Sequence, residues 1–166
     1  MLSLRQNSRP ARTTSQKGFS LIELLIVVAI IGIIAAIAIP NLLASRRAAN
    51  EASAISAVRT LSSGEESYRS TFGSGVNFTD LNGLVNKTMV DKSLGSATTL
   101  PNAKSGYIYS VLTLDGGTGF CAGAAPTTAN NGSRNFSSDT PGVLYAHPLD
   151  VANPPTTTTG GIPLNN

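Results

Sequence analysis

A single carboxylate, Glu23, stands near the start of an apolar run that is long enough to cross a membrane. Residues 19–39 are otherwise apolar except for Ser20 and Gly32, and the 16 residues from Leu24 to Ile39 carry no charge. A charge placed in the hydrocarbon of a bilayer costs at least ~2.5 kcal/mol. The position of Glu23, just after Lys17, Gly18 and Phe19, therefore requires a specific explanation.

The other side chains with catalytic or ligand chemistry are few and scattered. Cys121 is the only cysteine, so no internal disulfide can form, and its place in a predicted strand favours a small core residue. His147 is the only histidine and is expected at the surface. We find no nucleophile–base pair, metal-ligand cluster or phosphate-binding loop in the sequence, so neither an enzyme nor a bound cofactor is expected.

The basic charge of the chain is concentrated at its N-terminus. The formal net charge is +3, and residues 1–18 hold no acid and four bases, which are Arg5, Arg9, Arg12 and Lys17. The other 148 residues carry eight Lys and Arg against nine Asp and Glu, so the net charge does not predict nucleic-acid binding. This polar N-terminal segment cannot pack, and we expect residues 1–18 to be disordered or removed.

The apolar run continues into a long amphipathic helix. With its flanking residues the run reaches the roughly 20 residues needed to span a bilayer, and Pro40 interrupts it. Beyond Pro40, apolar residues recur at steps of three, four or seven and predict one buried stripe: Ala44, Ala48, Ala52, Ile55, Val58, Leu61, Tyr68 and Phe72. The polar face is expected to hold Arg46, Arg47, Asn50, Glu51, Ser53, Arg59, Ser63, Glu66 and Arg69. One helix is thus predicted from about residue 19 to 72.

The region after this helix predicts a small antiparallel sheet. A short helix is expected near residues 79–85, followed by strands at 105–114, 120–126, 133–138 and 143–147. Turns are expected at 115–119 and 139–142, and the low-complexity tail at 154–166 is expected to be flexible. The predicted fold class is α+β, a long N-terminal α-helix packed against a small antiparallel β-sheet. Its parts are residues 1–18, 19–44, 45–153 and 154–166.

Two common kinds of N-terminal segment explain this region only in part. A secretory signal peptide has an apolar core of about 7–15 residues and a cleavage site of small residues. This run is longer, and it continues as an amphipathic helix. A plain membrane anchor would keep the basic end in the cytoplasm and place residues from about 44 onward outside. The anchor accounts for everything except Glu23 and Pro40.

The stretch "KGFSLIELLIVVAIIGIIAAIAIPN" resembles the type III signal of type IV pilins and of the related pseudopilins of type II secretion. The family pattern is a basic leader ending in Gly, then an aromatic residue, a Glu four residues later and a Pro further on. Gly18, Phe19, Glu23 and Pro40 match these positions. The match is close over residues 17 to about 60 and looser beyond, and the fixed spacing of its elements makes the motif specific.

The resemblance implies a processing and assembly pathway. A prepilin peptidase would cut between Gly18 and Phe19 and methylate the new amine of Phe19. The mature chain would wait in the bacterial inner membrane and then polymerise with its own copies into an extracellular filament, with help from inner-membrane assembly machinery. Glu23 would pair with the Phe19 amine of a neighbouring subunit. The stretch from Gly32 to Pro40 would lose helix in the filament, and the alternative is a kink tolerated in a membrane helix.

The resemblance leaves the role within the family open. We interpret the chain as a major pilin whose filament serves adhesion, twitching motility or DNA uptake. The alternatives are a major pseudopilin, a minor pilin, and a membrane-tethered binding domain that does not polymerise. Many pilins carry a C-terminal disulfide loop that this chain cannot make. A calcium site would draw on Asp115, Asp139 and Asp150, which lack ligand spacing, and Thr156 to Thr159 are candidate O-glycan acceptors.

Overall fold

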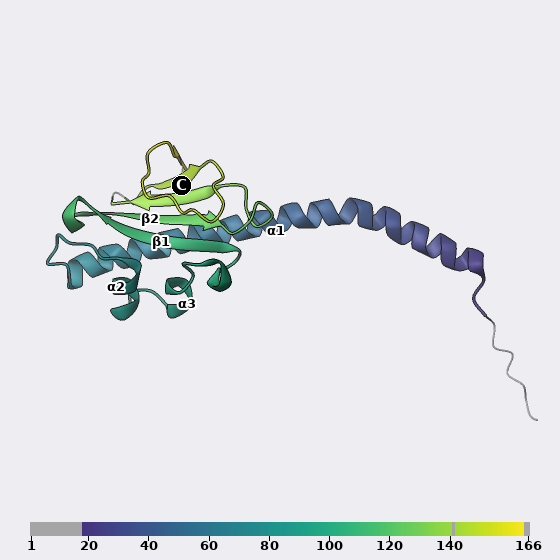
Figure 1. Cartoon of the computed structure of the whole chain (residues 1–166), viewed down its shortest axis with the longest axis horizontal. Helices are drawn as coiled ribbons and strands as arrows, with labels where there is room; N and C mark the ends of the chain where they lie inside the picture. Colours follow the sequence, from purple (N-terminus) through teal and green to yellow (C-terminus); the bar gives the residue numbers. More distant parts are fainter. Residues whose placement is uncertain (1–17, 141, 165–166) are drawn as a thin grey trace, which may run out of the picture. The chain divides into compact units, whose positions relative to one another are not determined.

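The computed structural model describes residues 18–140 and 142–164 of the 166-residue chain. The chain divides into two compact units, residues 1–39 and 40–166. One helix, α1 (Leu21–Thr71), begins in the first unit and ends in the second (Figure 1). The leader expected at residues 1–18 lies outside the described residues, apart from Gly18.

The first unit contributes the apolar beginning of α1. Every described residue in this unit is exposed except Ala35, which is half-buried. The helix begins at Leu21, two residues later than expected, and it continues through Gly32 and Pro40. A proline removes one backbone hydrogen bond from a helix, and here a 51-residue helix continues past that loss. The expected loss of helix between Gly32 and Pro40 concerns the filament and stays a prediction.

The second unit packs the later part of α1 against the sheet, with a different face from the one predicted. The buried residues of α1 are Glu51, Ala54, Ala57, Val58, Leu61, Gly64 and Glu65. The predicted stripe was therefore wrong at both ends, because Ala44, Ala48 and Ala52 at its start and Phe72 at its end are exposed. Positions 51, 54, 58, 61 and 65 follow steps of three and four, so they share one helix face. Because this face has a glutamate at each end, the pattern of apolar residues did not predict it.

Five antiparallel strands follow one another in sequence order across the sheet. They are β1 (Tyr107–Leu114), β2 (Gly119–Pro126), β3 (Asn135–Asp139), β4 (Leu144–His147) and β5 (Ile162–Pro163). The first four confirm the predicted strands to within two residues, and β5 was not expected. The β1–β2 turn contains a 3-10 helix, η2 (Asp115–Gly117), where Gly116 and Gly117 have φ values of 69° and 101° that favour glycine.

Short helices connect α1 to the sheet. The helix expected near residues 79–85 is α2 (Leu81–Asn86), and it is followed by α3 (Lys92–Gly95) and the 3-10 helix η1 (Leu100–Asn102), which were not predicted. The side chains of Asp80 and Asp91 accept hydrogen bonds from backbone N–H groups in the first turns of α2 and α3, as N-caps do. Both helices add leucines to the core, namely Leu81, Leu84 and Leu94.

The core lies between α1 and the inner face of the sheet. Val58 and Leu61 of α1 meet Tyr109, Phe120 and Phe136 of the strands there, and all five are buried. The arrangement confirms the predicted α+β class, in which a long N-terminal helix packs on a small antiparallel sheet.

The C-terminal segment covers the outer face of the same sheet (Figure 1). Strand β2 is buried at every position, whereas a strand of a sheet with one solvent-exposed face would alternate buried and exposed residues. The Sγ atom of Cys121 lies 3.8 Å from the carbonyl oxygen of Pro155, and the N–H of Ala152 donates to the carbonyl of Pro126. At Gly123 a Cβ atom would overlap the carbonyl of Pro155, so this close approach requires glycine.

Polar side chains of β3 hold the C-terminal segment in place. Asn135 is 1% exposed, and its Nδ2 donates to the carbonyls of Asp150 and Asn153 at 2.9 Å each, while its Oδ1 accepts the N–H of Asp150 at 3.1 Å. The hydroxyl of Thr158 donates to Asp139 at 3.1 Å. The flexibility expected for the tail stays a prediction, and in this structure hydrogen bonds connect the tail to the sheet as far as Leu164. The chain has one cysteine and therefore no internal disulfide, and these hydrogen bonds hold its C-terminal region on the sheet.

Candidate assembly segment and head contacts

The bond between Gly18 and Phe19 lies just before the first helical residue. Gly18, Phe19 and Ser20 are not helical, and Phe19 is 81% exposed. Exposed backbone outside regular structure is the preferred kind of site for proteolysis. The geometry at this junction is therefore suited to cleavage.

Ser20 and Glu23 form one half of a capping box at the start of α1. In such a box the third helical residue accepts a hydrogen bond from the backbone N–H of the N-cap residue. Here the N–H of Ser20 donates to Glu23 Oε2 at 3.4 Å, and the N–H of Leu24 donates to the carbonyl of Ser20 at 3.2 Å. The Ser-x-x-Glu spacing indicates this local role of Glu23, which was not among the predictions from the sequence. Within residues 18–140 and 142–164, no Lys or Arg forms an ion pair with Glu23.

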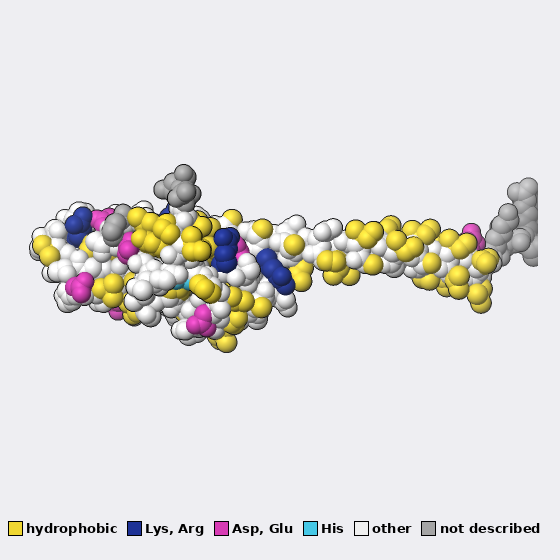
Figure 2. Space-filling view, turned by 90° about the horizontal axis from the view of Figure 1, so that it is seen from above, with side chains coloured by type: hydrophobic (Ala, Val, Ile, Leu, Met, Phe, Trp, Pro, Cys, Tyr) yellow, Lys and Arg dark blue, Asp and Glu magenta, His cyan; other side chains and the backbone are white. Residues whose placement is uncertain are grey.

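The beginning of α1 presents hydrophobic side chains around its whole circumference. The large hydrophobic residues between Phe19 and Ile39 are 44–81% exposed, and Figure 2 shows hydrophobic side chains along this stretch. By length and composition this helix is able to span a membrane. Soluble monomers rarely expose apolar patches larger than a few hundred Å², so this surface requires lipid or a protein partner.

Glu51 fastens α1 to the loop between β2 and β3. Its Oε1 accepts hydrogen bonds from the backbone N–H and the hydroxyl of Ser133, at 2.8 and 2.6 Å. Its Oε2 accepts from Nη2 and Nε of Arg134, at 2.8 and 3.3 Å. Burial raises the pKa of the Glu51 carboxyl, but the hydrogen bonds from Ser133 and Arg134 outweigh burial and leave the pKa below its ordinary value. The sequence placed Glu51 on the solvated face, whereas it is 7% exposed.

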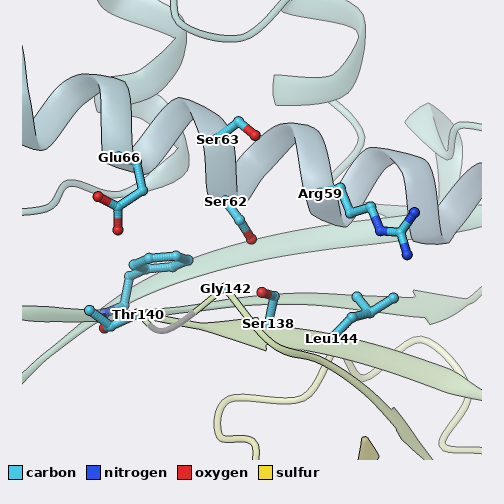
Figure 3. A pocket seen from close by; sticks show the side chains of 9 residues that line it. Arg59, Ser62, Ser63, Glu66, Ser138, Thr140, Gly142 and Leu144 are labelled. Atoms are coloured by element: carbon cyan, nitrogen blue, oxygen red, sulfur yellow. The ribbon is translucent and has the colours of Figure 1, made fainter. Parts of the chain in front are cut away.

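A groove of about 450 Å³ lies between α1 and the strands β3 and β4. Figure 3 shows Ser62 and Glu66 of α1 on one side of it and Ser138 and Thr140 on the other. Its lining residues are Arg59, Ser62, Ser63, Glu66, Phe120, Ser138, Thr140, Gly142 and Leu144. Glu66 is tied to Arg69 by a 2.7 Å ion pair, and the Thr140 hydroxyl accepts the N–H of Phe120. The polar groups of Glu66 and Thr140 are therefore already bonded to other residues of the chain.

The two candidate residues of β2 and β4 are both structural. Cys121 is confirmed as a core residue, and burial together with the nearby Asp139 carboxylate raises its thiol pKa to about 11. His147 was expected at the surface but is half-buried, and burial lowers its pKa. Its Nε2 lies 2.6 Å from the hydroxyl of Ser137, a pair that the sequence did not indicate. Because Ser137 is fully buried, this pair is closed to a substrate.

The three aspartates considered for calcium lie in separate contacts. Asp115 belongs to η2, Asp139 accepts from Thr158, and Asp150 accepts from Asn153. In the parts of the chain that the structure describes, no group of three or more His, Cys, Asp or Glu side chains is placed to hold a metal. Among the tail threonines, Thr158 uses its hydroxyl in the Asp139 bond, while three others are exposed, namely Thr156, Thr157 and Thr159.

Comparisons with known proteins identify the N-terminal segment. Residues 13–39 match the prokaryotic N-terminal methylation motif. The type IV wide pilus major component PilA4 of Thermus thermophilus is 71% identical over 35 residues, which are 21% of this chain and 27% of that protein. The type II secretion system core protein G of Pectobacterium carotovorum is 33% identical over 64 residues, 39% of this chain and 41% of that protein. The chain thus matches less than half the length of these two relatives.

A further match extends into the head. The fimbrial protein of Pseudomonas aeruginosa is 36% identical over 124 residues, 70% of this chain and 79% of that protein. No solved structure matches the chain significantly. Pilins and pseudopilins are structural proteins, and the chain is accordingly not an enzyme. With the methylation motif, the exposed apolar helix and the helix-on-sheet head in one molecule, the chain belongs to the type IV pilin family, which includes the pseudopilins of type II secretion.

Proposed function

We propose that this chain is the major subunit of a type IVa-like pilus. The observation that carries the proposal is the exposed apolar surface of α1 with one charge, Glu23, near its start. Packing these surfaces against those of other copies would stabilise a filament by roughly 25 cal/mol per Å² of apolar area removed from water. Gly32 and the alanines of this segment favour close approach of the helices.

Assembly would begin with removal of the leader. A prepilin peptidase cuts between Gly18 and Phe19 and methylates the new amine, and Glu23 of one subunit pairs with the Phe19 amine of the next. An ion pair in an apolar core favours one register, because breaking it costs ~3–5 kcal/mol. The precursor would lie in the bacterial inner membrane, and assembly machinery there would transfer it to the extracellular filament.

The extent of similarity supports a pilin over a pseudopilin. The match to the fimbrial protein covers 79% of that protein, while the match to core protein G covers 41%. A major pseudopilin of type II secretion is the second candidate, because its N-terminal segment shares the same motif. For the pilus we propose adhesion, twitching motility or DNA uptake as the role of the filament.

The test compares Glu23→Ala with Glu66→Ala, which removes one acid outside the apolar segment. Surface filaments are sheared from expressing cells, counted by electron microscopy and weighed by mass spectrometry. We expect the wild type and Glu66→Ala to give filaments whose subunits start at N-methylated Phe19. Glu23→Ala should be cut at Gly18 but give at least 100-fold fewer filaments, since ~3–5 kcal/mol per subunit exceeds two powers of ten.

Other results would redirect the assignment. Normal filaments from Glu23→Ala would contradict the role of Glu23. Processed wild-type protein that stays in the membrane, without filaments, would indicate the pseudopilin. An uncut wild-type chain would indicate a plain anchor, and a mature-sized product from Gly18→Val would contradict the peptidase assignment.

A further inference from the structure

Glu65 is a buried carboxyl that satisfies only one of its two oxygens. It lies on the buried face of α1 and is 0% exposed. Its Oε2 accepts the backbone N–H of Thr79 at 3.0 Å. Its Oε1 is also buried and has no hydrogen-bond partner. A buried carboxylate oxygen without a partner is costly, so the neutral acid is the form that this site favours.

Thr79, whose N–H donates to Glu65, belongs to the loop at residues 73–80, which follows α1. Backbone bonds to α1 and the Asp80 cap of α2 hold the two ends of this loop. Three of its other contacts with the rest of the head are made by Phe78 and Thr79. The N–H of Phe78 donates to the carbonyl of Gly117 at 2.8 Å, and the Phe78 and Phe120 rings lie 4.9 Å apart. The third contact is the bond from Thr79 to Glu65. Residues 74–77 are exposed, so between the two ends of the loop Phe78 and Thr79 are the residues that pack it on the head.

The charged groups around Glu65 do not favour its ionised form. On α1, Glu66 is adjacent, and Arg69 is engaged by Glu66 at 2.7 Å with its guanidinium 5.4 Å from the Phe78 ring. The loop contributes Asp80. The turn η2, whose Gly117 accepts the N–H of Phe78, contains Asp115, and Lys87 after α2 lies over the Phe72 ring. Across the described residues, no cation forms an ion pair with Glu65.

The balance of these effects sets the titration of Glu65 near neutral pH. Burial is the largest cause and raises its pKa, the bond from Thr79 lowers it, and the charges of Asp80 and Glu66 raise it further. The resulting pKa is about 7, against an ordinary value of 4.5. The folded head therefore holds this proton at a pH where a solvated glutamate has lost it.

We propose that Glu65 is a proton-operated latch, which holds the 73–80 loop against the head when neutral and releases it when ionised. Loss of the carboxyl proton to solvent leaves a charge in a site that lacks a counter-ion. The charged side chain gains free energy by reaching water, and doing so breaks its bond to Thr79. With pKa values of about 7 closed and 4.5 open, the closed-to-open ratio falls about 20-fold between pH 5.5 and 7.5.

The experiment uses the full chain in detergent micelles. Glutamate labelled with ¹³C at the side-chain carboxyl gives four signals, from Glu23, Glu51, Glu65 and Glu66. Glu65→Gln identifies the signal of Glu65 by its disappearance. Hydrogen exchange of the Thr79 and Phe78 amides is measured at pH 5.5 and 7.5 and expressed as protection factors, which removes the intrinsic dependence of exchange on pH.

We expect the Glu65 signal to titrate near pH 7 and the protection of Thr79 to fall about 20-fold between the two pH values. Glu65→Gln keeps an acceptor for Thr79 and should show equal protection at both. Glu66→Gln, the matched control, should retain most of the fall, because the charge of Glu66 is the smallest cause that raises the pKa of Glu65. A Glu65 midpoint near 4.5 would overturn the latch, and so would a midpoint near 7 with constant Thr79 protection. If Glu65→Gln fails to fold, the pH dependence of Thr79 protection in the wild type decides the matter by itself, because constant protection would overturn the latch.

Discussion

Replacing Glu51 by alanine should destabilise the head far more than replacing Glu66, the other ion-paired glutamate of α1. Both side chains lie on the same helix and both pair with an arginine. Glu51 is buried and accepts four hydrogen bonds, whereas the side chain of Glu66 is 42% exposed. The pair of variants therefore separates the effect of burial from the loss of a charge.

The magnitude follows from the partners that Glu51→Ala leaves behind. The two bonds from Ser133 are lost, and a hydrogen bond to a charged group contributes about 1.5–3 kcal/mol. Because Ser133 is exposed and its donors regain water, we count the two bonds together as one. The side chain of Arg134 is 47% exposed and regains water, so its ion pair contributes only ~0.2–1 kcal/mol. We expect Glu51→Ala to lower the unfolding free energy by ~2–4 kcal/mol, or ~8–16 °C in Tm for a unit of this size. Glu66→Ala should lower it by at most ~1 kcal/mol.

Thermal unfolding of the full chain in detergent micelles measures this difference. The near-ultraviolet circular dichroism of tyrosine reports the head alone, because all four tyrosines lie between residues 68 and 145. Adding Arg134→Ala to Glu51→Ala should change Tm little, since the partner of Arg134 is already gone. Equal Tm values for Glu51→Ala and Glu66→Ala would refute the reasoning.

Two more predictions concern the outer face of the sheet. Gly123→Ala should displace the segment around Pro155 and speed the reaction of the Cys121 thiol with a maleimide at least tenfold; Gly119→Ala, whose Cβ meets neighbours at 3.4 Å or more, should not. Equal rates for both variants would contradict this packing. Because burial lowers the pKa of His147, the folded head binds this proton less readily than the unfolded chain, and the unfolding free energy should fall as pH drops below 6.5. His147→Gln should lose that contribution, so its change in Tm between pH 7.5 and 5.5 should differ from that of the wild type.

The features of the N-terminal segment could be predicted from the sequence because each depends on residues that are close together in the chain. Gly18, Phe19, Glu23 and Pro40 stand at fixed spacing, and an apolar run of this length has few physical uses. Strands β1 to β4 were predictable for the same kind of reason, since each lies between turn-forming residues. The capping bond between Ser20 and Glu23 is also local and could have been read from its spacing.

The face of α1 that packs on the sheet could not be predicted from local sequence. Glu51 and Glu65 are charged residue types, and residue type alone assigns them to solvent. Glu51 is buried because Ser133 and Arg134, more than 80 positions later, supply its hydrogen bonds. The alanines at 44, 48 and 52 continue an apolar pattern but are exposed in the described structure.

The sequence by itself determined the processing motif, the apolar helix and the order of the first four strands, because each depends on neighbours within a few residues. Tertiary structure alone decided that two glutamates enter the buried face of α1 and that the C-terminal segment closes over β2. A buried carboxyl and a tail rich in Pro and Thr are stable only against specific donors and surfaces. The fold brings those partners together from distant parts of the chain, as Asn135 does for Asp150 and Asn153.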